Sequence, residues 1–207
     1  MEKNGVKMPI TLTDRLRGWF KWAVDPVAKF FLNLGLTPNT MTILGLVGNF
    51  LGAYFLSQGK MSLGGWIMLI MTPIDALDGT MARMLGQPSA FGAFVDSVSD
   101  RYSELVLFGG LMYHYVMTMD TLGVMLAFSA SVGSVMVSYV RARAESNGYE
   151  AKMGIMTRVE RYLVLAPLLV FNKPIIALWI LAILANFTAL QRILFVRRQA
   201  HEQMKAG

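Results

Sequence analysis

Four aspartates close together in the sequence are the residues best suited to carry out chemistry. The stretch from Asp75 to Asp100 reads DALDGTMARMLGQPSAFGAFVDSVSD. Asp75 and Asp78 are three residues apart and Asp96 and Asp100 are four apart, so on two helices the members of each pair would share a face. We therefore expect four carboxylates to converge on one small volume.

The surroundings of this stretch indicate what such carboxylates could hold. Segments apolar enough to cross a bilayer flank it on both sides. Ionised carboxylates at membrane depth are costly unless a cation or a water-filled cavity compensates their charge. Oxygen-only ligands suit Mg2+ or Mn2+, and four carboxylates can hold one or two such ions. We predict a site for one or two divalent metal ions at these carboxylates.

The composition places this site in a membrane protein of one domain. The 207-residue chain is 55% hydrophobic and only 15% charged, with a mean hydropathy of +0.48. These values lie outside the soluble range. The first thirty residues carry no cleavable signal pattern. The absence of cysteine excludes disulfides, thiolate zinc sites and cysteine nucleophiles.

The net charge of +6 comes from basic residues dispersed at the ends of predicted helices. Anionic lipid headgroups and phosphorylated substrates are therefore the expected partners, and nucleic acid is not.

The apolar pattern predicts an all-α integral membrane protein with six transmembrane helices, at about 39–57, 61–82, 92–117, 121–144, 159–172 and 174–196. Only Lys60 and Lys173, of nineteen Lys and Arg residues, lie in the connections on one side. The positive-inside rule then places both termini and the aspartate stretch at the cytoplasmic face of the cell membrane. We expect residues 35–198 to form the catalytic domain and residues 199–207 a cytoplasmic tail.

The N-terminal region precedes the first span. Residues 1–12 are expected to be disordered. From Thr13 to Leu34 apolar residues recur at helical spacing with basic residues between them, which predicts an amphipathic helix lying on the membrane surface. Gly35 would end this helix, and Pro38 and Asn39 belong to the start signal of the first span.

Glycines and one arginine accompany the aspartates, in the pattern D-x2-D-G-x2-A-R-x8-G-x3-D-x3-D. Gly79 and Gly92 stand four residues before Arg83 and Asp96, respectively, and the missing side chains would let a nucleotide or a helix approach the backbone. Arg83 can form a forked pair with phosphate oxygens, and Ser89 in the turn could donate to a phosphate.

This pattern resembles the signature of the CDP-alcohol phosphotransferases, integral membrane enzymes with six transmembrane helices that are usually homodimers. Pro38 and Asn39 also fit the family, so the resemblance extends over most of the chain. It implies that Asp75, Asp78 and Asp96 are metal ligands, and that Asp100 is either a ligand or the base for the acceptor hydroxyl. A base needs an accessible oxygen. The nucleotide and CDP-lipid would be held by Pro38, Asn39, Asp78, Gly79, Ala82, Arg83, Gly86 and Ser89.

Later arginines form a second group of candidate residues, expected at the level of the aspartates. A separately bound phosphate would explain them, whereas the alternative is that they are ordinary cytoplasmic anchors. The segments SYVRARAE at 138–145 and RVER at 158–161 resemble those of prokaryotic phosphatidylinositol-phosphate synthases, although Val159 stands where a proline is common. Those enzymes join CDP-diacylglycerol to inositol 1-phosphate and release CMP. This resemblance implies an acceptor-phosphate site of Arg141, Arg143, Arg158, Arg161 and Arg192.

Other interpretations of the two groups stay open at this point. Glycerol 3-phosphate as acceptor would make the protein a phosphatidylglycerophosphate synthase, and the lipid donor could be an ester or an archaeal ether. A buried ion-pair network with Arg83 and Arg101 would leave two of the four aspartates uncompensated. A cation-coupled transporter also uses intramembrane carboxylates, but it does not explain the glycine and alanine spacing around Arg83.

Overall fold

The computed structural model describes residues 24–86 and 89–206, without the side chains at 75, 76 and 206. The predicted disordered segment 1–12 and the first part of the predicted amphipathic helix lie outside the described residues. The described part of the chain is helical and contains no strand. A helix over 24–33 precedes α2 (Pro38–Ser57), α3 (Met61–Met84), α4 (Ala90–Met117), α5 (Thr121–Ser146), α6 (Arg158–Val170) and α7 (Pro174–Ala206).

Local signals set several of these helix ends. Gly35 adopts a left-handed φ of 79° after the first helix, which glycine tolerates best. The Thr37 side chain then caps α2 by accepting a hydrogen bond from the backbone N–H of Thr40 at 3.3 Å, with Pro38 as the first helical residue. At the other end of the chain, α7 continues beyond the predicted limit of 196, because no Gly or Pro interrupts the segment up to Ala206.

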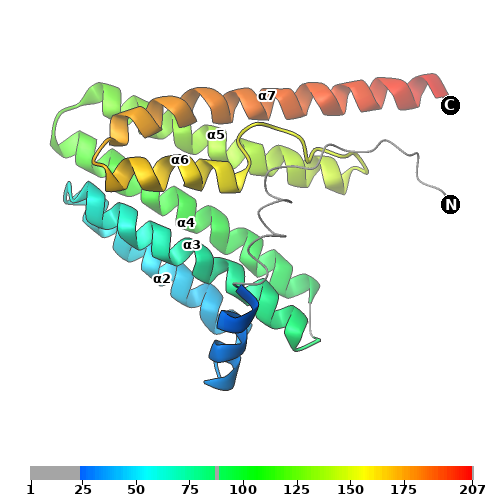
Figure 1. Ribbon diagram of the computed structural model, residues 1–207. Helices are drawn as coiled ribbons and strands as arrows, with labels where there is room; N and C mark the ends of the chain where they lie inside the picture. Colours follow the sequence, from blue (N-terminus) through cyan, green and yellow to red (C-terminus); the bar gives the residue numbers. More distant parts are fainter. Residues whose placement is uncertain (1–23, 87–88, 207) are drawn as a thin grey trace.

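The helices form two groups that diverge toward one end (Figure 1). One group consists of α2, α3 and α4, in which α2 packs against both α3 and α4. The other consists of α5, α6 and α7, in which α7 packs against both α5 and α6. The groups touch where α4 packs against α5 and where α3 packs against α6. The tight turns at 58–60, 118–120 and 171–173 lie together where the groups meet. The end of α3, the start of α4 and the loop at 147–157 lie at the diverging end (Figure 1).

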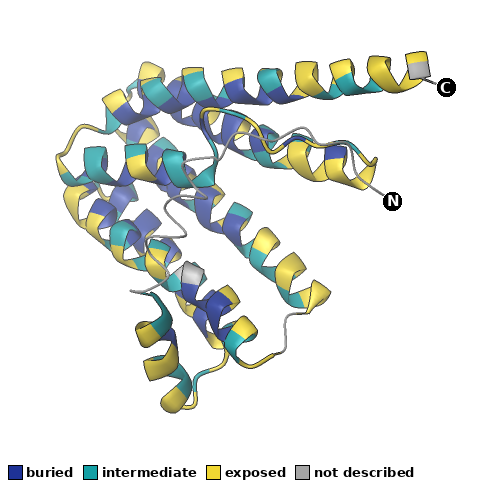
Figure 2. Ribbon diagram, turned by 45° about the vertical axis from the view of Figure 1, so that its right-hand side comes forward, coloured by how far each residue is buried: buried dark blue, intermediate teal, exposed yellow. Residues whose placement is uncertain are grey.

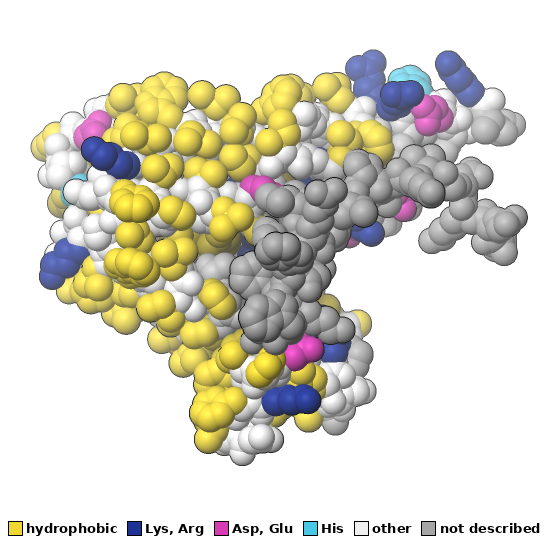
Figure 3. Space-filling model, in the orientation of Figure 1, with side chains coloured by type: hydrophobic (Ala, Val, Ile, Leu, Met, Phe, Trp, Pro, Cys, Tyr) yellow, Lys and Arg dark blue, Asp and Glu magenta, His cyan; other side chains and the backbone are white. Residues whose placement is uncertain are grey.

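A continuous apolar core joins the helices. Leu56, Leu107, Phe108, Leu169 and Leu178, from four different helices and the two helix groups, are almost fully buried in it. Many other large apolar side chains point outward, and they cover much of the visible surface of the bundle (Figures 2 and 3). An outer surface of this kind is suited to lipid rather than to water.

Three described helices are long and apolar enough to cross a membrane: Pro38–Ser57, Thr121–Ser146 and Pro174–Lys205. α3 and α4 are as long, but their ends near the aspartate connection carry acidic and basic side chains. α6 has only 13 residues. The chain is thus an all-helical membrane protein with three candidate spans.

The backbones of α2 and α4 touch at Gly110. A Cβ atom at this position would lie 2.4 Å from the carbonyl oxygen of Ala53, which is far inside van der Waals contact. Close helix packing of this kind in lipid depends on small residues. The neighbouring Gly109 has nothing within 4 Å of its own Cβ position.

We expect Gly110→Ala to lower the free energy of unfolding by about 1–3 kcal/mol, as overpacking does. Gly109→Ala is the matched control, expected to be neutral or to stabilise by up to about 1 kcal/mol because alanine is the better helix former. Unfolding by SDS titration in mixed micelles measures both. Equal effects of the two substitutions would contradict the contact between α2 and α4.

Candidate active site

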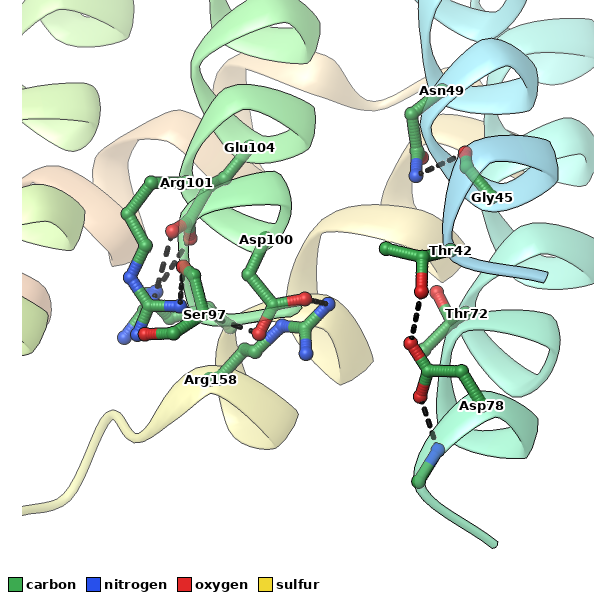
Figure 4. A network of polar contacts seen from close by, with 12 residues as sticks. Thr42, Gly45, Asn49, Thr72, Asp78, Ser97, Asp100, Arg101, Glu104 and Arg158 are labelled. Carbon is green, nitrogen blue, oxygen red and sulfur yellow. Dashed lines mark hydrogen bonds and ion pairs between the residues drawn. The ribbon is translucent and has the colours of Figure 1, made fainter. Parts of the chain in front are cut away.

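Asp78, near the end of α3, is held in place by a neighbouring helix. Its side chain is buried, and the Thr42 hydroxyl on α2 donates a hydrogen bond to its Oδ2 at 2.7 Å (Figure 4). The backbone N–H of Gly79 donates to Oδ1 at 2.5 Å. Thr42 stands one turn after Pro38, so this contact brings the start of α2 next to the aspartate stretch. Thr42 was not predicted as a site residue, because in the sequence it is marked only by a hydroxyl one turn into the first predicted span.

Asp100, on α4, is paired with two arginines. Arg158, the first residue of α6, places Nη2 2.5 Å from Oδ1, and Arg101 places Nη1 3.2 Å from Oδ2. The guanidinium of Arg158 also lies over the Tyr162 ring, 5.4 Å from its centroid. Figure 4 shows this guanidinium on the side of Asp100 that faces Asp78. The ion pair thus links a predicted acceptor arginine to the aspartate stretch.

The predicted metal ligands are partly described. Asp96 lies on α4, one turn before Asp100. The side chain of Asp75 lies outside the described part. Among the described side chains, no three acidic or imidazole groups are close enough together to hold a metal ion.

The donor set nevertheless fits a hard divalent cation, since the ligand atoms of these aspartates are all oxygens. The oxygens of Asp78 contact Thr42 and Gly79, whereas those of Asp100 contact arginines. Because the oxygens of Asp78 and Asp100 contact different protein groups, these two carboxylates do not meet at one point. The convergence of all four aspartates remains a prediction.

The predicted nucleotide residues lie around Asp78 at the same end of the bundle. Asn39, Gly79 and Arg83 are exposed, and a Cβ at Gly79 would meet only Arg83 Nη1, at 3.7 Å. Arg83 also donates from Nη2 to the Thr80 hydroxyl at 2.9 Å. The backbone beside Asp78 is therefore open to a ligand.

The remaining nucleotide candidates lie nearby in the chain. Pro38 and Ala82 are half-buried. Gly86 has a left-handed φ of 65° with nothing within 4 Å of its Cβ position, and Ser89 caps α4 by accepting from the Gly92 N–H at 2.9 Å. The roles of these residues in binding remain predictions.

Arg161 is a predicted acceptor residue that the structure buries. Its Nε and Nη2 donate to the two carboxylate oxygens of Glu104 at 2.7 and 3.0 Å, and Nη1 donates to the Met156 carbonyl at 3.1 Å. Arg161 is 2% exposed and Glu104 6%. Glu104 was missed by the sequence analysis, although it continues the line of Asp96 and Asp100 along α4 at the same spacing of four residues.

Arg192 on α7 is buried in a similar way. It donates from Nε to the Met153 carbonyl at 2.8 Å and from Nη1 to the Val137 carbonyl at 2.5 Å, so it ties the 147–157 loop to α5 and α7.

The other two predicted acceptor arginines are exposed. Arg141 pairs with Glu145 at 3.0 Å, one turn along α5, and Arg143 lies on the same helix. Phosphate binding by any of the five arginines remains a prediction. Arg158 and Arg161 both pair with buried acidic groups, and Arg158 is the more accessible of the two, with 31% of its side chain exposed.

Comparison with known proteins agrees with this geometry. The family profile of CDP-alcohol phosphatidyltransferases matches residues 35–194. The chain is 36% identical over 188 residues to a phosphatidylinositol phosphate synthase of Mycobacterium marinum, covering 86% of this chain and 80% of the relative. It is 33% identical over 183 residues to an archaetidylinositol phosphate synthase of Pyrococcus horikoshii, covering 88% and 95%.

A solved structure supports the same relationship. The crystal structure of the phosphatidylinositol phosphate synthase of Mycobacterium tuberculosis with CDP-DAG bound matches with a TM-score of 0.76 at 31% identity, over 84% of this chain and 92% of that chain. The same enzyme in complex with manganese and citrate matches with a TM-score of 0.78 at 30% identity, over 84% and 88%. The chain therefore belongs to the CDP-alcohol phosphatidyltransferase family and is a transferase.

Proposed function

We propose that this enzyme acts in phospholipid biosynthesis by transferring a phosphatidyl group from CDP-diacylglycerol to inositol 1-phosphate, giving phosphatidylinositol phosphate and CMP. The observation that carries the proposal is the ion pair between Asp100 and Arg158, because it sets a predicted acceptor arginine beside the aspartates of the family signature. The names of the Mycobacterium relatives support the acceptor, and the bound CDP-DAG in one related structure supports the donor.

In the proposed membrane arrangement, α2 to α7 form six spans, the amphipathic helix lies at the interface, and both termini face the cytoplasm. The distribution of Lys and Arg supports this orientation. Although α6 has only 13 residues and reaches about 20 Å at 1.5 Å per residue, it packs between the longer α3 and α7.

The lipid donor would enter sideways from the bilayer, with its tails remaining there. The usual family assembly supports a homodimer.

The proposed chemistry takes place at the aspartates. An oxygen of the acceptor hydroxyl attacks the β-phosphorus of the CDP-lipid, the bond from that phosphorus to the CMP oxygen breaks, and CMP leaves. A divalent ion bound by Asp75, Asp78, Asp96 and Asp100, Mg2+ or Mn2+, would supply charge neutralisation on the pyrophosphate. The manganese in the related structure supports such an ion. Asp100 would take the hydroxyl proton or bind the ion.

The cytidine nucleotide would lie on the open backbone at Gly79, with Arg83 donating to a phosphate. The acceptor phosphate would be bound by the arginines, of which Arg158 contacts Asp100. Arg141, Arg143 and Arg158 are accessible, while Arg161 and Arg192 would need to exchange a protein contact for the phosphate.

We expect the purified protein to incorporate labelled inositol 1-phosphate into lipid when CDP-diacylglycerol is present, and not to incorporate free inositol. Thin-layer chromatography of the lipid product measures this, and an ether-linked CDP-lipid tested in parallel determines the preferred donor. Preferential use of glycerol 3-phosphate would instead identify a phosphatidylglycerophosphate synthase.

A further inference from the structure

Arg158 occupies a position between two parts of the proposed site. It begins α6, its Nη2 lies 2.5 Å from Asp100 Oδ1, and its guanidinium lies on the side of Asp100 that faces Asp78 (Figure 4). It therefore provides positive charge in the region where the aspartates are expected to hold a divalent ion.

The carboxylate of Asp100 is mostly buried, with 10% of its side chain exposed. Arg101 contacts the other oxygen, Oδ2, at 3.2 Å. A divalent ion or the proton of an acceptor hydroxyl needs one of these oxygens, and Arg158 already contacts Oδ1. Two positive groups so close to one carboxylate would also repel each other. Ion binding at Asp100 and the ion pair with Arg158 therefore oppose one another.

The guanidinium of Arg158 has an alternative partner in the proposed reaction. A phosphate group accepts forked hydrogen bonds from arginine with the same geometry as a carboxylate and carries more negative charge. With 31% of its side chain exposed, Arg158 can reach such a ligand, whereas Arg161 is enclosed by its contacts with Glu104 and Met156.

We propose that Arg158 exchanges between Asp100 and the phosphate of the acceptor, and that this exchange is a basis of acceptor specificity. The inference rests on the proposed function. A phosphorylated acceptor draws Arg158 away and makes Asp100 available, while an unphosphorylated alcohol leaves the ion pair intact. Binding of the acceptor phosphate and of the divalent ion then favour each other, and by linkage the effect is reciprocal.

Titration of the full-length protein in nanodiscs with Mn2+, followed by the electron paramagnetic resonance signal of free Mn2+, tests the exchange without turnover. In the unaltered protein, saturating inositol 1-phosphate should tighten Mn2+ binding by about tenfold, within the range usual for coupled sites. Free inositol should have no effect.

Arg158→Gln should bind Mn2+ about tenfold more tightly than the unaltered protein when no acceptor is present, and inositol 1-phosphate should add nothing. If Arg158 only bound the acceptor, the coupling would vanish without this initial gain. Arg101→Gln is the matched control, because it also removes a cation from Asp100 but should keep the response to inositol 1-phosphate.

Two results would overturn the exchange: unchanged Mn2+ affinity in Arg158→Gln without acceptor, or identical behaviour of the two variants. Incorporation of inositol 1-phosphate into lipid by the same preparation separates this failure from failure of the proposed function. If incorporation occurs without the coupling, the exchange is wrong and the function stands. If incorporation does not occur, the proposed function is wrong and the exchange with it.

Discussion

Replacing Asp78 with alanine is expected to reduce CMP release by about a thousandfold or more, because several kcal/mol of charge stabilisation depend on the metal ligands. Asp78 is buried between α2 and α3, where Thr42 and Gly79 fix its orientation. We expect the same loss for Asp75→Ala and Asp96→Ala. CMP released from CDP-diacylglycerol in the presence of inositol 1-phosphate and Mg2+ measures the effect.

Asp120→Ala provides a matched control for the loss of an aspartate. Asp120 caps the start of α5 by accepting from the Gly123 N–H at 2.9 Å. This start of α5 lies at the end of the bundle away from the end of α3 (Figure 1). Its removal should cost about 1 kcal/mol of stability and leave turnover unchanged. Comparable turnover in Asp78→Ala and Asp120→Ala would show that the aspartate stretch is not the reaction centre.

The largest effect on stability is expected at Glu104. Glu104→Ala leaves the guanidinium of Arg161 buried without its carboxylate, and breaking a buried pair from one side typically costs about 3–5 kcal/mol. The loss should also release the start of α6, since Arg161 fixes Met156 there. The free energy of unfolding, from SDS titration in mixed micelles, measures the change.

Two further variants separate the buried pair from general effects of charge. The double substitution Glu104→Leu with Arg161→Met should recover much of the lost stability, since removing both charges removes the unpaired one. Glu202→Ala breaks the exposed pair with Arg198 and should cost at most about 1 kcal/mol. A double variant no more stable than Glu104→Ala would contradict this explanation.

Much of the fold could be predicted from local sequence. The helix over 24–33 ends just before Gly35, and α2 begins at Pro38, because a left-handed glycine, a threonine cap and a proline are signals that act within one turn. The starts of α3, α5 and α7 agree with the predicted spans to the residue. α7 continues beyond the predicted span at 174–196, since its last turns are polar and lack the apolar pattern that identifies a span.

The partners of the site residues could not be predicted in the same way. Aspartate spacing indicates which side chains share a helix face, but Glu104 and Arg161 are 57 positions apart and meet only because α4 and α6 are brought together by the fold. A carboxylate, a carbonyl or a phosphate can accept the hydrogen bonds of a buried guanidinium equally well, and only the packing decides among them. For this reason Arg192, expected to face a phosphate, is found donating to the carbonyls of Val137 and Met153.

The most direct test of the account follows both products of one reaction. The purified protein is incubated with CDP-diacylglycerol and labelled inositol 1-phosphate, and CMP and labelled lipid are measured with Mg2+, with excess chelator, and after Mn2+ is added back. We expect one CMP for each labelled lipid, formed only when a divalent ion is present. Full turnover in excess chelator, or CMP release without labelled lipid, would contradict it.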